Sequence, residues 1–162
     1  MKITRTIAVC VAAILLTSCN DNSHKTNDME KDTTIFGFGD AVTANFTGDA
    51  WVKMLSAVEN YDCNVYNVTF APGTRNHWHS HAVGLILLCT DGEGWYQEKG
   101  KAARRLRPGD VVNIPAGTMH WHGATIDKRF THIGITPKAS ANSADWGDPV
   151  TDREYEQVNR VE

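Results

Sequence analysis

The chain has 162 residues, enough for one domain with a substantial buried core. Its formal net charge of -3 gives no basic field of the kind that binds nucleic acid, so no nucleic-acid partner is expected. The 13 glycines and the scarcity of long apolar-periodic segments favour short strands joined by turns over a helical fold.

The N-terminal segment has the parts of a bacterial export signal. Lys2 and Arg5 give a positive start, and the apolar run over 7–16 is too short to span a bilayer. The run ends in LTSC, which resembles the lipobox of bacterial lipoproteins, a family in which the cysteine, here Cys19, is lipidated and becomes the first mature residue. A plain secretory signal cut nearby is the alternative.

These features predict how the chain is divided. The parts are a lipoprotein signal peptide over 1–18, a flexible polar tether over 19–34, and a single domain over 35–162 with its core at about 45–136. Acyl chains on Cys19 would anchor the protein to a membrane of the bacterial cell envelope, on the periplasmic or cell-surface side. Of the remaining cysteines, we expect Cys63 and Cys89 to be buried free thiols rather than a disulfide.

Beyond the tether, short apolar runs alternate with turn signals such as Pro72-Gly73 and Asp91-Gly92. The runs predict strands over 51–58, 65–70, 77–81, 85–90, 94–98, 101–106, 110–115, 120–124 and 129–135. Many short strands at this spacing are typical of an all-β sandwich or barrel. Near the end, Thr151 and Glu154 form a capping-box pattern that predicts a short helix, with a disordered acidic tail as the alternative.

Three histidines, His77, His79 and His81, stand at alternate positions of one predicted strand, where their side chains share a face. Imidazoles packed beside one another are poor core residues, and they would repel one another if charged. The pattern alone leaves open a metal site, a structural accident on a strand and a histidine-rich surface tract. Three imidazoles that converge inside a barrel would favour a bound metal ion, with a polar pocket lined by histidines and no metal as the alternative.

Two stretches resemble the two motifs of the cupin family. They are GTRNHWHSHAVGLILLCTDG (73–92) and GDVVNIPAGTMH (109–120), whose glycines, proline and histidines have the cupin spacing. Residues 45–135 are also similar to small bacterial monocupins of the carboxymuconolactone-decarboxylase-associated type, which include manganese-dependent hydroxynitrile lyases. The resemblance implies an all-β cupin fold, a double-stranded β-helix or jelly-roll barrel, here with a short C-terminal helix.

The resemblance also implies a metal site. His79, His81 and His120 match the family's histidine ligands for one divalent transition metal (Mn, Zn, Fe or Ni). The family's fourth ligand is a glutamate or glutamine, and the matching residue here is Leu85, which cannot coordinate. Three histidines completed by water resemble a catalytic zinc or an open iron site in ligand count. This departure leaves the identity of the metal and the activity open.

Three further histidines are candidates for the site. His122 shares the inward face with His120 and is a candidate general acid/base or a substitute ligand. His132 matches an inward pocket histidine of the similar proteins, which implies a catalytic role. For His77, a site role near the barrel mouth and a partly exposed strand end are both open.

Two tryptophans, Trp78 and Trp121, alternate with the histidines and should face outward, against the second sheet or another subunit. Monocupins of this type tend to pair through outward aromatic and apolar strand faces, so the resemblance implies a homodimer or a larger even assembly. The two tryptophans would supply that face.

Two functions fit these residues. The first is a metal-dependent enzyme of lyase, isomerase or oxygenase type, acting on a small organic carbonyl or hydroxy compound, with His122 or His132 moving a proton. Lyase chemistry is the first choice, on the resemblance alone. The second is a non-catalytic binder of a metal or small ligand at the cell envelope. The loss of the fourth ligand and the lipid anchor are both compatible with this function.

Overall fold

The computed structural model describes residues 34–56 and 61–160, so the predicted signal peptide and almost all of the predicted tether lie outside it. The elements in chain order are β1 (Asp40–Val42), β2 (Phe46–Thr47), β3 (Ala50–Met54), β4 (Cys63–Phe70), β5 (Arg75–Asn76), β6 (His79–His81), β7 (Leu85–Gly92), β8 (Gly94–Glu98), β9 (Arg104–Leu106), β10 (Val111–Ile114), β11 (His120–Ala124), β12 (Phe130–Pro137), β13 (Ala144–Trp146) and α1 (Asp152–Asn159). Within the described ranges, no helix is long and apolar enough to cross a membrane.

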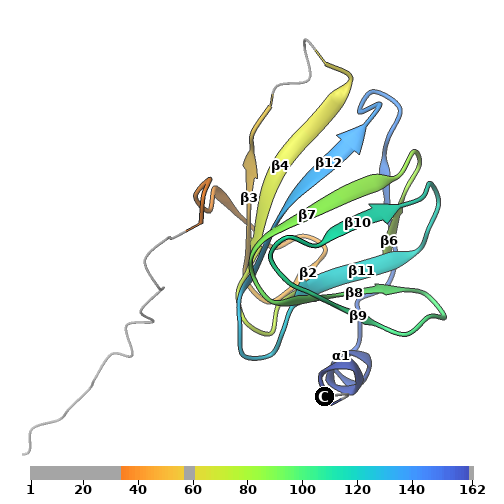
Figure 1. Ribbon diagram of the computed structural model, residues 1–162. Helices are drawn as coiled ribbons and strands as arrows, with labels where there is room; N and C mark the ends of the chain where they lie inside the picture. The colour runs from red at the N-terminus through yellow and green to blue at the C-terminus, as the bar shows by residue number, and fades with distance from the viewer. Residues whose placement is uncertain (1–33, 57–60, 161–162) are drawn as a thin grey trace, which may run out of the picture. The chain divides into compact units, whose positions relative to one another are not determined.

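The strands form two antiparallel sheets. One has the order β1-β3-β4-β12-β7-β10, and the other has the order β13-β6-β11-β5-β2, with β8 paired to both β11 and β9. Figure 1 shows the first sheet as a curled layer that faces the strands of the second. The architecture is the all-β jelly-roll barrel with a short C-terminal helix that the sequence predicted.

The main core lies between the two sheets because alternate side chains of each strand point inward. Along β7 the inward residues Leu85, Leu87 and Cys89 are buried, while their neighbours are half-buried. Phe70 and Phe130, from β4 and β12, are fully buried in the same cluster. Both described cysteines are free thiols, as expected, although Cys63 is only half-buried.

A second apolar cluster lies under α1, on the outer side of β8 and β11. Trp78 and Trp121 belong to it and pack with Tyr155 and Val158 of the helix. The two tryptophans therefore face away from the main core, as predicted. The two tryptophans pack against α1 of the same chain and not against the second sheet, so that part of the expectation was wrong.

The predicted strands differ from the observed ones in three ways. The bounds of β8 and β11 match the prediction, but β1, β2, β5 and β13 were missed because they are too short to show an alternating pattern. The strand predicted over 51–58 ends at Met54, after which two successive amides both donate to the carbonyl of Val65. The strand predicted over 77–81 begins only at His79, because the chain leaves strand geometry between β5 and β6.

Candidate metal centre

The centre is built on one strand pair. His79 of β6 and His120 of β11 are directly paired across antiparallel strands, so both rings lie on the same face, with centroids 4.2 Å apart. Their Nδ1 atoms lie 2.9 and 2.8 Å from the carbonyls of His77 and Thr118. A carbonyl can only accept, so each Nδ1 carries the proton and each Nε2 keeps a lone pair. This is the arrangement that orients histidine ligands around metals.

Two more histidines flank this pair, each two residues further along its strand. The ring of His81 lies 5.2 Å from that of His79 and 5.8 Å from that of His120. The ring of His122 lies 5.6 and 5.9 Å from the same two rings. Nitrogens of His79, His120 and His122 lie within 4.8 Å of one another, so these three could hold a metal ion. The ring of the predicted ligand His81 is about as near to the pair as the ring of His122, but its nitrogens are not part of this group, so the nitrogen distances favour His122 over His81.

The histidines adjoin a cavity of about 240 Å³. Its lining residues are Phe46, Val52, Tyr66, Val68, Phe70, Asn76, His79, His81, Leu85, His122, His132, Ala144 and Trp146. Leu85 is therefore placed beside the histidines, as the family pattern implies. None of these lining residues is acidic, lysine or arginine, so a charged group would lose its hydration without gaining an opposite protein charge. The cavity suits a small uncharged molecule.

His132 and His77 have different surroundings. His132 of β12 lines the cavity with its ring 4.8 Å from that of His122, and both of its ring nitrogens are buried without a hydrogen-bond partner. Burying a polar nitrogen without a hydrogen-bond partner costs free energy. This ring is therefore suited to a ligand that supplies the missing partner. His77 is half-buried and does not line the cavity, and it contributes its carbonyl to His79. The break before β6 removes His77 from the alternation.

Burial keeps the histidines neutral. It lowers the pKa of His81 and His132 to about 4 and the pKa of His120 below its ordinary value. Burial, and then the charge that a neighbouring histidine would carry, lowers the pKa of His79 and His122 well below the ordinary value. Near neutral pH all five rings are uncharged, which is the state that binds metal.

Two cavity residues that lie against the histidine rings were among those that the sequence did not reveal. Trp146 of β13 is paired with His79, stacks on its ring at 4.4 Å, and is 38% exposed at the cavity edge. A lone tryptophan in a polar stretch was the one sequence signal, and β13 is too short to give a pattern. Asn76 is buried against His122, but it precedes the strand break, so its inward position could not be counted from His79.

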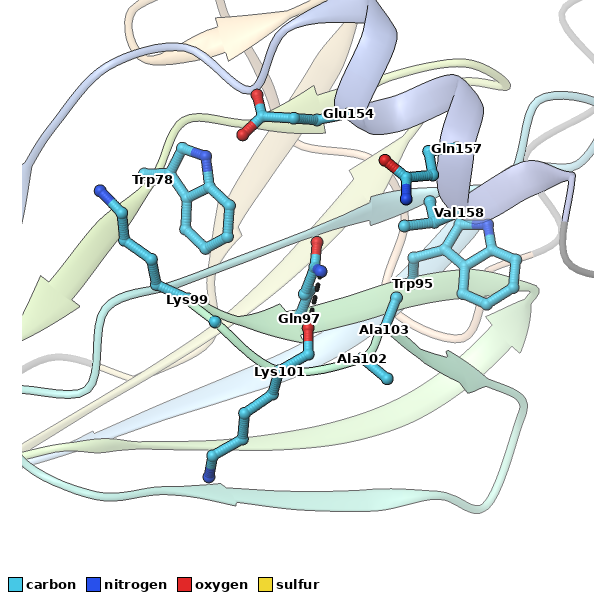
Figure 2. A pocket seen from close by; sticks show the side chains of 11 residues that line it. Trp78, Trp95, Gln97, Lys99, Lys101, Ala102, Ala103, Glu154, Gln157 and Val158 are labelled. Carbon is cyan, nitrogen blue, oxygen red and sulfur yellow. Dashed lines mark hydrogen bonds between the residues drawn. The ribbon is translucent and has the colours of Figure 1, made fainter.

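A larger hollow of about 460 Å³ lies between α1 and the β8–β9 connection (Figure 2). Two of its polar side chains are already used by the fold. The amide of Gln97 donates to the carbonyl of Lys101 and accepts from Trp121, and Glu154 closes the capping box with Thr151. The histidine-lined cavity is therefore the better candidate for a functional site.

Comparison with known proteins agrees with this geometry. The family model described as a cupin domain matches residues 66–133, which span β4 to β12 and include all five buried histidines. The chain belongs to the cupin family.

Three individual proteins show how far the similarity extends. A protein of Granulicella tundricola named (R)-mandelonitrile lyase is 43% identical over 89 residues, which cover 55% of this chain and 68% of that protein. The crystal structure of a cupin-like protein from Thermotoga maritima is 46% identical, with a TM-score of 0.76 over 79% of this chain and 98% of the other. A cupin 2 barrel protein from Rhodopseudomonas palustris, 20% identical with a TM-score of 0.58 over 76% and 86% of the two chains, shares the fold.

The lowered pKa values predict how stability depends on pH. Unfolded histidine takes up a proton near pH 6.5, whereas His81 and His132 resist protonation in the folded state until about pH 4. The metal-free protein should therefore lose stability as the pH falls from 6.5 to 4, with His132 contributing up to about 3 kcal/mol of the loss. Urea unfolding at a series of pH values measures this. His132→Gln should flatten the profile, and an equally steep profile in that variant would contradict the assignment.

Proposed function

We propose that the protein is a metal-dependent cupin enzyme, a lyase acting on a small uncharged hydroxy or carbonyl compound. The observation that carries this proposal is a cluster of neutral histidine nitrogens beside a small cavity that no charged side chain lines. The relative named (R)-mandelonitrile lyase supports the class of reaction. In this proposal His79, His81 and His120 hold one divalent transition metal, which would supply a Lewis acid when bound.

The chain's own residues then have separate roles. Phe70 and Val68 form an apolar wall that positions the substrate and excludes water. His132, neutral and without a protein partner, accepts the hydroxyl proton as the bond between the hydroxyl-bearing carbon and its leaving group breaks. The same proton passes to the leaving group, so that a carbonyl compound and a protonated leaving group result.

A non-catalytic binder at the cell envelope is the second candidate. The observation that favours it is Leu85, an apolar side chain at the cavity position where the family has its fourth ligand. A metal site that has lost a ligand could retain binding without turnover. Turnover by the metal-loaded protein discriminates the two functions.

The first test measures metal content and turnover in the same set of variants. Wild-type protein should contain about one transition-metal ion per chain by elemental analysis, and the double variant His79→Ala/His81→Ala should contain almost none. His77→Ala is the matched control and should retain the metal, because that ring does not line the cavity. His132→Ala should keep the metal but reduce turnover of hydroxynitriles and related neutral hydroxy compounds by about 100-fold or more.

Stoichiometric metal in the double variant would contradict the ligand assignment. Metal-loaded wild-type protein that turns over none of the compounds would instead favour the binder.

The second test uses Leu85. Leu85→Gln adds an oxygen donor beside the histidines, so affinity for manganese should rise about tenfold or more, and more than affinity for zinc. Leu85→Ala removes no ligand and should leave both affinities nearly unchanged, although it would reduce stability because the side chain is buried. Calorimetric titration of metal-free protein measures this. Equal affinities in wild type and Leu85→Gln would show that the side chain does not reach the ion.

We also propose that the protein is a lipoprotein of the bacterial envelope, anchored through Cys19. This rests on the sequence of 1–19, which lies outside the described residues. Cys19→Ser should move the protein from the membrane to the soluble fraction, and unchanged fractionation would contradict the anchor. The homodimer stays a prediction.

A further inference from the structure

Asn76, the last residue of β5, makes a two-point contact with His122. Its Oδ1 accepts the backbone N–H of His122 at 2.9 Å. Its Nδ2 lies 3.1 Å from Nε2 and 3.4 Å from Nδ1 of the His122 ring. Asn76 is 2% exposed and His122 is 4% exposed, so water does not compete for these contacts.

The contact fixes which atom of the amide faces the ring. The backbone N–H of His122 can only donate, so the amide atom opposite it must be the oxygen. The NH₂ group therefore points to the imidazole and donates to a lone pair of its nearer nitrogen. A flipped amide would set two donors against each other and leave both unpaired.

For the three neighbouring histidines, His79, His81 and His120, no protein donor in the described ranges is directed at a ring lone pair. Nδ1 of His81 is buried without a hydrogen-bond partner, and His79 and His120 use Nδ1 only to donate to carbonyls. Among the residues that the structure describes, His122 is the member of the cluster whose ring lone pair is occupied by a protein donor. A metal that took this lone pair would have to displace the amide and leave its NH₂ group buried and unpaired.

We propose that Asn76 is a positioning residue that withholds His122 from the metal. The ion then takes His79, His81 and His120, and His122 stays free to face the substrate beside His132. The inference rests on the metal site of the proposed function. It favours His81 over His122 as the third ligand, although the nitrogens of His122 lie nearer to those of His79 and His120. Because displacing the amide leaves a buried donor unpaired, binding through His122 should be weaker than binding through His81 by about tenfold or more.

The test is a set of zinc titrations of the metal-free protein by calorimetry. In the wild-type background, His81→Ala should weaken zinc binding by about 100-fold, and His122→Ala should change it less than about threefold. In an Asn76→Leu background, which removes the donor at similar size, His122→Ala should now weaken zinc binding by about tenfold or more. The coupling between positions 76 and 122 is a readout that a merely structural role of Asn76 would not produce.

Cobalt(II) provides a second readout. Its visible spectrum should change from wild type to Asn76→Leu, because a fourth imidazole joins the ion, and should revert when His122→Ala is added. Asn76→Asp is the matched variant: it keeps the acceptor for the backbone N–H but removes the donor, and it should shift the spectrum in the same direction.

The outcomes separate the two proposals. Zinc binding that depends on His122 as strongly as on His81 in the wild-type background overturns the role of Asn76 and leaves the metal site standing. That comparison needs no change at Asn76, so it holds even if Asn76→Leu does not fold. Absence of zinc and cobalt binding in the wild-type protein overturns the metal site and the role of Asn76 together.

Discussion

The pairing of β6 with β11 is the constraint on which the candidate site depends. His79 and His120 share a face only because they are directly opposite each other. A slip of one residue would turn His79 and His81 out of the barrel. Close packing opposes such a slip at the far end of β11, where a Cβ on Gly123 would lie 2.5 Å from the carbonyl of Thr74.

Helix α1 secures the same strands from outside. The hydroxyl of Tyr155 donates to the carbonyl of Ala124 at the end of β11. On β5, the buried guanidinium of Arg75 donates to the carbonyl of Val150 and lies 4.6 Å from the ring of Tyr155. The outer sides of both strands are thus tied to one helix, which places Asn76 and His122 against each other on the inner side.

Strand alternation predicted an all-β sandwich or barrel, because it needs only local sequence. The jelly-roll fold and the places of His132 and Leu85 were implied by the family resemblance, and both side chains line the cavity. Alternation failed at the break between β5 and β6, where counting by twos no longer tells inside from outside. His77 was left unresolved for that reason, and Asn76 was missed. Trp146 was missed because β13 joins β6 across a long stretch of chain, a contact that no periodicity encodes.

The position of β13 has a consequence for motion. Because β13 lies outside β6, the strand that carries His79 and His81 is hydrogen-bonded on both sides, and the exposed edge of the sheet belongs to β13. Sheet edges fray at lower free energy than interior strands. Fraying here would lift Trp146 away from the cavity while His79 stays paired with His120. Trp146 at the cavity edge and the histidines of β6 therefore belong to neighbouring strands, of which β6 is paired on both sides and β13 on one.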